Sequence, residues 1–135
     1  MSYCLDTNIC IFHLNKSAST VTERLKALSA EEVLIPSMVV AELLHGAEKS
    51  AKRESNLANL ALFLSPYRII SFDQKAARIY ASIRAALERK GQIIGPNDIV
   101  IAATTLAHNA ILVTNNTKEF SRIDGLKIED WTQAD

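Results

Sequence analysis

The chain has 135 residues, a length typical of one globular domain that buries a substantial core. Its 15 basic and 15 acidic residues cancel, so overall charge neither indicates nor excludes a nucleic-acid partner. Two cysteines are too few for a disulfide framework and lack zinc-binding spacing, so we interpret Cys4 and Cys10 as reduced, buried thiols.

No segment of the sequence resembles a signal peptide. Asp6 interrupts the start of the chain, where a signal peptide would need a basic segment followed by an apolar one. No apolar run approaches the ~18 residues that a membrane helix needs. We therefore expect a single cytoplasmic domain over residues 1–135, with no membrane contact.

The first third of the chain alternates strand and helix patterns. SYCL is a short apolar run that predicts a strand ending at Asp6. TNICIFHLN and TVTERLKALSA carry the apolar spacing of helices, and VLIP predicts a second strand. Strands separated by helical segments are typical of parallel βαβ units.

The middle of the chain predicts two helices. Ser37 is expected to cap the first of them, and Gly46 is expected to end it. The second helix contains Leu57, Leu60 and Leu64 and stops before Pro66. These three leucines lie on one face, which either joins the core or forms part of a dimer interface.

The last half repeats the alternation. RIISF predicts a third strand, and Asp73 is expected to cap a long helix that Gly91 closes. Its inward residues are expected to be Ala76, Ile79, Tyr80, Ile83 and Leu87. Pro96 suits the first turn of a helix that is apolar nearly all round to Ala107, which predicts burial. AILVT and LKIED predict two more strands, giving an α/β fold with a parallel sheet flanked by helices.

Acidic and amide side chains stand singly beside these expected strand ends and helix starts: Asp6, Glu42, Asp98, Asn116 and Glu119. In α/β folds the carboxyl ends of parallel strands meet at one edge of the sheet. Carboxylates gathered there repel one another unless a cation lies among them. Oxygen ligands without histidine or thiolate favour Mg²⁺ or Mn²⁺ over zinc, and such an ion activates water for phosphodiester hydrolysis.

Each of these residues also has a purely structural interpretation. Asp6 is a favoured N-cap for a helix starting at Thr7, and Asp98 is a favourable charge in a first helical turn. Glu42 alone is a common solvated helix residue, and Asn116 is a common turn residue. The four residues taken together are less easily explained in this way than any one of them alone.

The ordered set LDTN, AELLHG, ND and VTNNTKEF resembles the PIN-domain nucleases, and within them the VapC ribonuclease toxins of VapBC toxin–antitoxin pairs. The resemblance covers nearly the whole chain. It implies a PIN-like parallel sheet flanked by helices and cleavage of RNA, with transfer RNA a familiar target, dependent on magnesium or manganese. It also implies a VapB-like antitoxin and a homodimer.

Carried over residue by residue, Asp6, Glu42 and Asp98 match the acidic positions of the family's site, with Asp6 and Asp98 as metal ligands. Thr7 and Asn8 match the polar pair beside the first acid. Asn116 stands where many relatives have a fourth Asp, which removes one negative charge and leaves a neutral oxygen ligand or a supporting role. Thr114 and Glu119, in the same motif, are further supporting residues.

Two alternatives remain at this point. A housekeeping RNA-processing nuclease would share the site, and the neutral Asn116 is also consistent with a PIN-like module that binds nucleic acid or a partner without cutting. An aspartyl-phosphate phosphatase is discounted, because its DxD start would need an acid where Asn8 stands. His13, His45 and His108 are interpreted as unrelated packing or surface residues, and Trp131 as packing against the domain. Basic residues such as Lys49, Lys52 and Arg53 either contact phosphates or form an ordinary solvated face.

Overall fold

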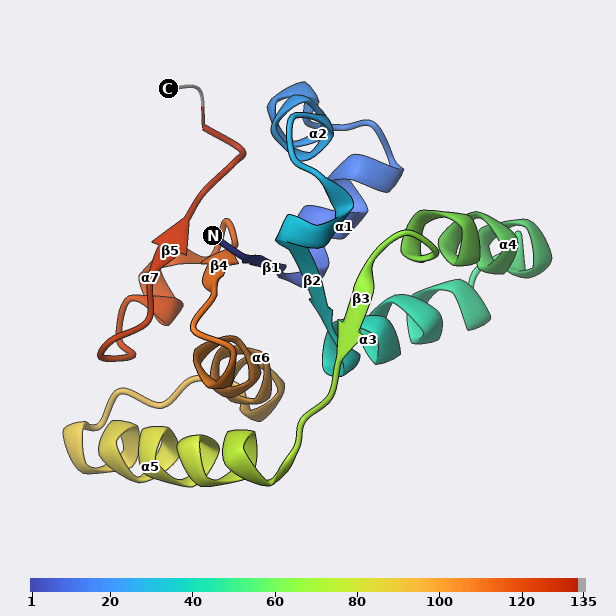
Figure 1. Ribbon diagram of the computed structural model, residues 1–135. Helices are drawn as coiled ribbons and strands as arrows, with labels where there is room; N and C mark the ends of the chain where they lie inside the picture. Colours follow the sequence, from blue (N-terminus) through green and yellow to red (C-terminus); the bar gives the residue numbers. More distant parts are fainter. Residues whose placement is uncertain (134–135) are drawn as a thin grey trace.

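A five-stranded parallel sheet forms the centre of the computed structural model, which describes residues 1–133 (Figure 1). The strands follow the order β3-β2-β1-β4-β5 across the sheet. Their bounds are β1 Tyr3–Leu5, β2 Val33–Pro36, β3 Arg68–Ile70, β4 Ile111–Val113 and β5 Ile128–Glu129. The predicted parallel α/β fold is therefore confirmed.

Helices cover both faces of this sheet (Figure 1). In that view α1 and α2 lie above it, α5 and α6 lie below it, and α3 and α4 flank the end that carries β3. A short 3₁₀ helix, η1, precedes β2. The bounds are α1 Thr7–Leu14, α2 Ser19–Lys26, η1 Ala30–Glu32, α3 Ser37–Glu48, α4 Arg53–Leu64, α5 Gln74–Lys90, α6 Pro96–Ala107 and α7 Thr117–Phe120.

The strand order reverses beside β1. The chain first places β2 and then β3 on one side of β1, and it then returns to place β4 and β5 on the other side. In open α/β sheets, such a reversal leaves a crevice outside the carboxyl ends of the two strands concerned, and ligands bind there. The crevice here lies at the ends of β1 and β4, which are followed by Asp6 and Thr114.

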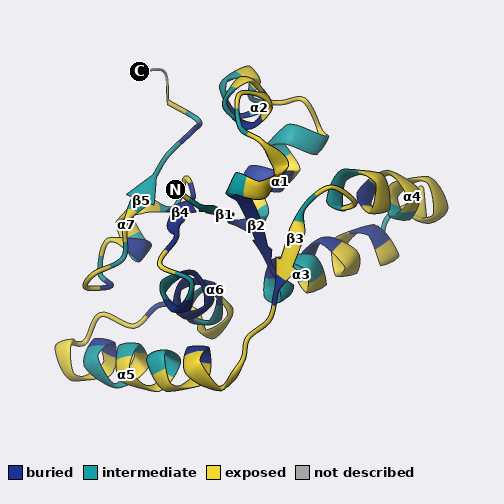
Figure 2. Cartoon of the chain, in the orientation of Figure 1, coloured by how far each residue is buried: buried dark blue, intermediate teal, exposed yellow. Residues whose placement is uncertain are grey.

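The core contains the strands of the sheet and buried side chains of α1, α2 and α3 as well as α6. All residues of β2 and β4 are buried, and α6 is buried along most of its length, as its nearly continuous apolar pattern predicts (Figure 2). Cys4 and Cys10 are free and buried, as predicted. Trp131 is also buried and packs on Tyr3, with ring centroids 5.6 Å apart. No helix within residues 1–133 is long and apolar enough to cross a membrane.

Helix α5 largely follows the prediction. The Asp73 carboxylate accepts a hydrogen bond from the Ala76 amide at 2.9 Å, and Gly91 ends the helix with a left-handed φ of 66°. Of the expected inward residues, Ala76 and Leu87 are buried, whereas Ile79, Tyr80 and Ile83 are only half-buried. The helix therefore packs on α6 along one edge while its other side faces solvent.

Several predicted boundaries differ from those of the structure, three of them for clear physical reasons. Ser37 is the first helical residue of α3 and not its cap, because the preceding Pro36 holds the extended conformation of the N-cap position. Gly46 does not end α3, which continues to Glu48. The third strand comprises Arg68–Ile70 alone, because it pairs only with β2 and lies at the edge of the sheet.

Candidate active site

The register between β1 and β4 places Asp6 beside Thr114. Leu5 stands opposite Val113 in the parallel ladder, and the Asp6 amide donates a hydrogen bond to the Val113 carbonyl oxygen at 2.9 Å. The first residue after each strand therefore lies at the edge of the sheet where the strand order reverses.

Asp6 is held from two directions. One carboxylate oxygen, Oδ1, accepts a hydrogen bond from the Thr7 amide at 2.8 Å, so Asp6 caps α1. The other, Oδ2, accepts a hydrogen bond from the Thr114 hydroxyl at 2.7 Å. Asp6 is only 5% exposed, and burial raises its pKa, with a further increase from the negative charge of Glu42. Capping and membership of the acidic cluster thus coexist in one side chain.

Glu42 reaches the same crevice from α3. The Thr7 hydroxyl donates a hydrogen bond to Glu42 Oε1 at 2.6 Å, which joins the start of α1 to the second turn of α3. The side chain is half-buried. Thr7, one of the predicted supporting residues, therefore positions Glu42. Asn8, the other member of that pair, is exposed on the first turn of α1.

Asp98 lies in the first turn of α6 and is half-buried. Burial and, in decreasing order, the negative charges of Asp6, Glu42 and Glu119 together raise the pKa of Asp98 to about 6. These causes show that the three predicted acids, together with Glu119, lie close enough to interact electrostatically. The structure thus brings together side chains that are separated by up to 113 positions in sequence.

Asn116 and Glu119 form a pair at the edge of this cluster. Asn116 is the N-cap of α7, and its side-chain amide donates a hydrogen bond to Glu119 Oε2 at 3.0 Å. The Asn116 backbone amide donates to the Thr114 hydroxyl oxygen at 3.0 Å. The side-chain amide of Asn116 thus orients the Glu119 carboxylate, whose negative charge contributes to the raised pKa of Asp98.

The chemistry of this site suits a hard cation. Its potential metal ligands are carboxylate groups whose negative charges raise the pKa of Asp6 and Asp98. A divalent cation would relieve this unfavourable accumulation of negative charge. Within residues 1–133, no three acidic, histidine or cysteine side chains already stand close enough to ligate one ion. The acids are therefore coupled by charge without being closed around a common point.

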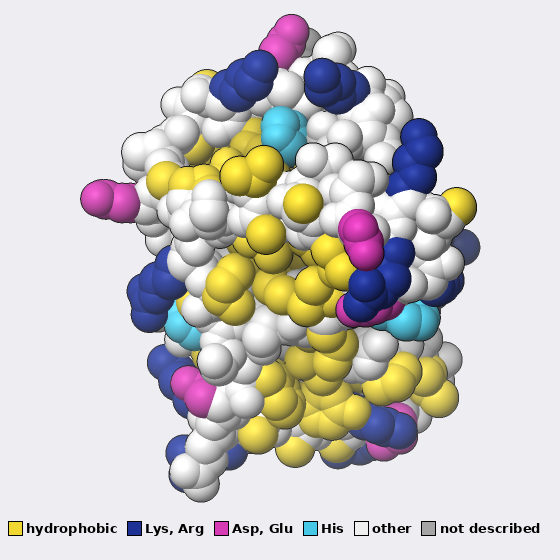
Figure 3. Space-filling view, turned by 90° about the vertical axis from the view of Figure 1, so that its right-hand side faces the viewer, with side chains coloured by type: hydrophobic (Ala, Val, Ile, Leu, Met, Phe, Trp, Pro, Cys, Tyr) yellow, Lys and Arg dark blue, Asp and Glu magenta, His cyan; other side chains and the backbone are white. Residues whose placement is uncertain are grey.

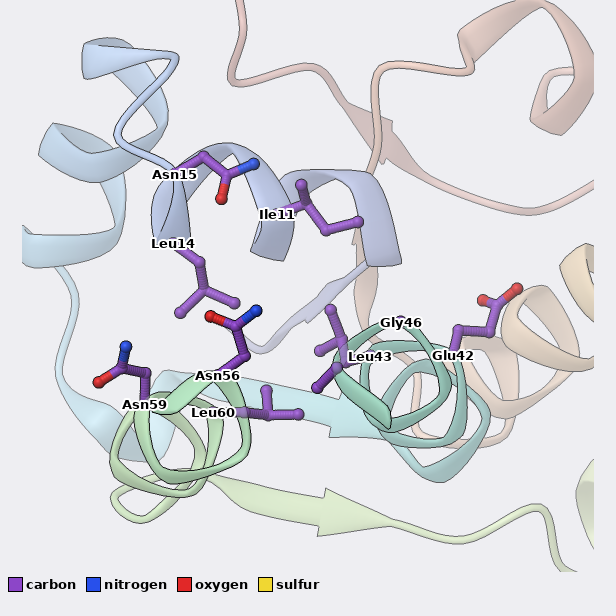
Figure 4. A pocket seen from close by; sticks show the side chains of 10 residues that line it. Ile11, Leu14, Asn15, Glu42, Leu43, Gly46, Asn56, Asn59 and Leu60 are labelled. Carbon is purple, nitrogen blue, oxygen red and sulfur yellow. The ribbon is translucent and has the colours of Figure 1, made fainter. Parts of the chain in front are cut away.

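An apolar pocket that was not predicted from the sequence opens beside Glu42 (Figure 4). It has a volume of about 310 Å³ and lies between α1, α3 and α4, where Ile11, Leu14, Leu43 and Leu60 point toward one another. Glu42 extends from α3 away from these side chains. Leu60 had been expected in either the core or an interface, and its helical spacing gave no indication that it borders a hollow.

Comparison with known proteins agrees with the fold. A model of the PIN domain matches residues 3–126 of the chain. The chain therefore belongs to the PIN-domain family of nucleases.

Within that family, the chain is similar to VapC ribonucleases over nearly its full length. It is 46% identical to Ribonuclease VapC2 of Rickettsia felis, covering 97% of this chain and 98% of the relative. It is 42% identical to the tRNA(fMet)-specific endonuclease VapC of Shigella flexneri, covering 98% of this chain and 99% of the relative.

Solved structures show the same likeness. VapBC2 from Rickettsia felis, bound to a DNA fragment from its promoter, contains a chain that matches with a TM-score of 0.90 at 44% identity, covering 97% of this chain and 99% of that one. DNA-bound VapBC from Salmonella typhimurium contains a chain that matches with a TM-score of 0.91 at 40% identity, covering 97% and 98%.

Proposed function

We propose that the chain is an endoribonuclease that depends on Mg²⁺ or Mn²⁺, with its active centre at the carboxyl ends of β1 and β4. The observation that carries the proposal is the mutual electrostatic effect of Asp6, Glu42 and Asp98 at this crevice. Such an accumulation of carboxylates costs stability unless a cation binds there. Site residues span positions 6 to 119, so residues 1–135 are proposed to work as one domain.

In this proposal Asp6 and Asp98 ligate the cation, and Glu42 completes the acidic edge. A bound divalent ion supplies an activated water molecule and stabilises negative charge on the phosphate. Thr114 orients Asp6 through its hydroxyl, and Thr7 orients Glu42 in the same way. The first turn of α6 places Asp98 where the helix dipole favours its ionised form.

Glu119 takes the role of the fourth acid in this proposal. Asn116 cannot supply that charge, but its amide holds the Glu119 carboxylate at 3.0 Å. Because the Asn116 side-chain amide is neutral, it orients Glu119 without adding charge repulsion to the acidic cluster. The departure from the family's usual Asp at this position is then compensated three residues further along the same short helix.

The proposed substrate is RNA, and transfer RNA is the first candidate. One relative, 42% identical, bears the name tRNA(fMet)-specific endonuclease. Its near full-length likeness to this chain supports the choice of transfer RNA as the first substrate to test. An enzyme with this substrate would act in the cytoplasm.

We also propose that the chain is the toxin of a toxin–antitoxin pair and binds a VapB-like antitoxin. Similar chains have been solved as VapBC complexes. Figure 3 shows a broad patch of hydrophobic side chains on the side of α3 and α4, with charged groups around its margin. Ile11, Leu44 and Leu62 are exposed on α1, α3 and α4, and the apolar pocket adjoins Glu42. An antitoxin peptide bound in this pocket would lie beside the active centre.

We also propose that the chain forms a homodimer, on the basis of the family resemblance alone.

Cleavage of bulk bacterial transfer RNA tests the proposal. Purified protein is incubated with and without Mg²⁺, and the same assay is run on Asp98→Asn and on Asp124→Asn, a matched removal of an exposed acid outside the cluster. We expect cleavage only with metal, its loss in Asp98→Asn and its retention in Asp124→Asn. Binding of the RNA without any metal-dependent cleavage would instead favour the non-cleaving module, which the neutral Asn116 also allows.

A further inference from the structure

A second groove opens on the opposite side of Glu42 from the apolar pocket. It lies between α3 and the start of α6 and has a volume of about 380 Å³. The residues that matter for its chemistry are Met38, Glu42, His45, Gly46, Lys49 and Asn97. Because Glu42 belongs to the acidic cluster and Asn97 precedes Asp98, the groove begins at the proposed site of cleavage.

The polar character of this groove changes along α3. Glu42, His45 and Lys49 are three and four residues apart, so they share one face of the helix. The face therefore runs from a carboxylate at the active centre to a cation about two turns away, roughly 10 Å along the axis. An anionic chain that places one phosphate at the metal centre would meet Lys49 with a neighbouring phosphate.

Lys49 is available for such a contact. Among the residues that the structure describes, no acidic side chain forms an ion pair with Lys49, which is exposed. Its neighbour Arg53, in contrast, is paired with Glu48 at 2.6 Å. The cation that borders the groove is therefore uncompensated, whereas Arg53, four positions along the chain, is neutralised.

Gly46 provides an independent observation. It lies inside α3, where glycine lowers helix stability relative to alanine, and its φ is not left-handed. A Cβ at this position would meet no atom within 4 Å, so close packing within the chain does not require glycine. Its effect is to keep the helix surface flat where the groove and the apolar pocket adjoin, so that another molecule can approach the backbone closely.

We propose that this groove binds the nucleotide adjacent to the cleaved phosphodiester bond of single-stranded RNA. The inference rests on the proposed ribonuclease function. Met38 and the flat surface at Gly46 receive the base, the His45 ring stacks on it, and the Asn97 amide hydrogen-bonds to its edge. Lys49 contacts the neighbouring phosphate. RNA is the favoured occupant of this groove because its lining includes the Lys49 ammonium, the His45 imidazole and the Asn97 amide. The neighbouring pocket between α1, α3 and α4 is mainly apolar and offers no such set of groups.

The test compares Lys49→Gln with Lys52→Gln, which removes an equal charge from an exposed residue outside the groove. Bulk bacterial transfer RNA is the probe, with binding measured in chelator and cleavage measured in Mg²⁺. We expect Lys49→Gln to weaken binding and raise KM by roughly threefold to tenfold with kcat nearly unchanged. The slope of log affinity against log salt should fall by about 0.7, while Lys52→Gln behaves as the wild type.

Gly46→Gln supplies a readout that a structural role would not give. Replacing a helical glycine with a good helix former should raise the Tm of the metal-free protein by a few degrees. The added side chain should nevertheless weaken RNA binding in the same assay. A more stable protein with poorer binding supports an occupied groove.

The result that overturns the proposal is unchanged RNA affinity, salt slope and KM in both Lys49→Gln and Gly46→Gln while the wild type cleaves. Equal weakening by Lys49→Gln and Lys52→Gln also overturns it, because the effect would then be general charge attraction. Failure of the proposed function looks different: the wild type itself would show no metal-dependent cleavage.

Discussion

The Thr114 hydroxyl donates a 2.7 Å hydrogen bond to the Asp6 carboxylate across 108 positions of sequence. The same hydroxyl oxygen accepts a hydrogen bond from the backbone amide of Asn116 at 3.0 Å. A buried hydroxyl that both donates and accepts fixes the ends of β1 and β4 relative to each other. Thr114 thus connects the first acid of the site to the turn that carries Asn116 and Glu119.

Replacing Thr114 with Val should affect both stability and pH dependence. Val has a similar shape but leaves Oδ2 of Asp6 and the backbone amide of Asn116 without a hydrogen-bond partner, which costs about 1–3 kcal/mol of unfolding free energy. The lost hydrogen bond also favoured the ionised form of Asp6, so the pKa of Asp6 should rise further. Urea unfolding and the pH profile of cleavage measure these two effects, and the acidic limb of the profile should move to higher pH.

Thr104→Val is the matched control, because the Thr104 hydroxyl is also buried but donates only to the Val100 carbonyl within α6. It should leave the pH profile where it is in the wild type. Identical profiles for the Thr114 and Thr104 variants would show that Thr114 does not position a titrating acid.

Asp98→Asn should stabilise the metal-free protein at neutral pH. The pKa of Asp98 rises from 3.8 to about 6 in the folded state, so its contribution to stability is fully present below about pH 4 and is lost as pH rises through about 6. Asn carries no charge at either pH. The variant should therefore match the wild type near pH 4 and exceed it by about 1–2 kcal/mol near pH 7, after allowance for partial exposure.

Urea denaturation in chelator at both pH values measures this difference. Asp124→Asn removes an acid that is 92% exposed and should show no such dependence on pH. A wild type that is the more stable protein near pH 7 would mean that Asp98 acts only as a favourable first-turn charge.

Asn116→Asp should make the metal-free protein less stable and its response to metal larger. The substitution replaces the amide that donates to Glu119 with a second carboxylate at about the same 3.0 Å separation. Thermal unfolding should give a lower Tm in chelator and a larger rise of Tm with Mn²⁺ than in the wild type. Glu119→Gln, which removes charge from the same pair, should give the smaller rise; equal responses in all three proteins would place this pair outside the metal site.

Local patterns were sufficient to predict most of the fold. The cap at Asp73, the stop at Gly91 and the burial of α6 depend on residues within a few positions of each other, and each is confirmed. Gly46 shows where this reasoning fails. Glycine ends a helix where the backbone becomes left-handed, as at Gly91, but Gly46 keeps a helical backbone.

The site was predictable as a set of residues but not as an arrangement. The strand-end positions of Asp6 and Asn116 indicated one edge of the sheet, yet the hydrogen bond between Thr114 and Asp6 depends on the register of β1 against β4. The contact between Thr7 and Glu42 likewise needs the packing of α1 against α3. His45 was interpreted as an unrelated histidine, because the groove that it lines forms only when α3 and α6 pack together.

Calorimetric titration of the wild type with Mn²⁺ tests most directly whether the acids form one metal centre. Near pH 6 the Asp98 carboxyl is partly protonated, and metal binding should release that proton. Titration in two buffers of different ionisation enthalpy should therefore show release of roughly half a proton near pH 6 and almost none near pH 8. Asp98→Asn should bind weakly without this release. Binding of equal strength in the wild type and Asp98→Asn, with no proton release in either, would contradict the account.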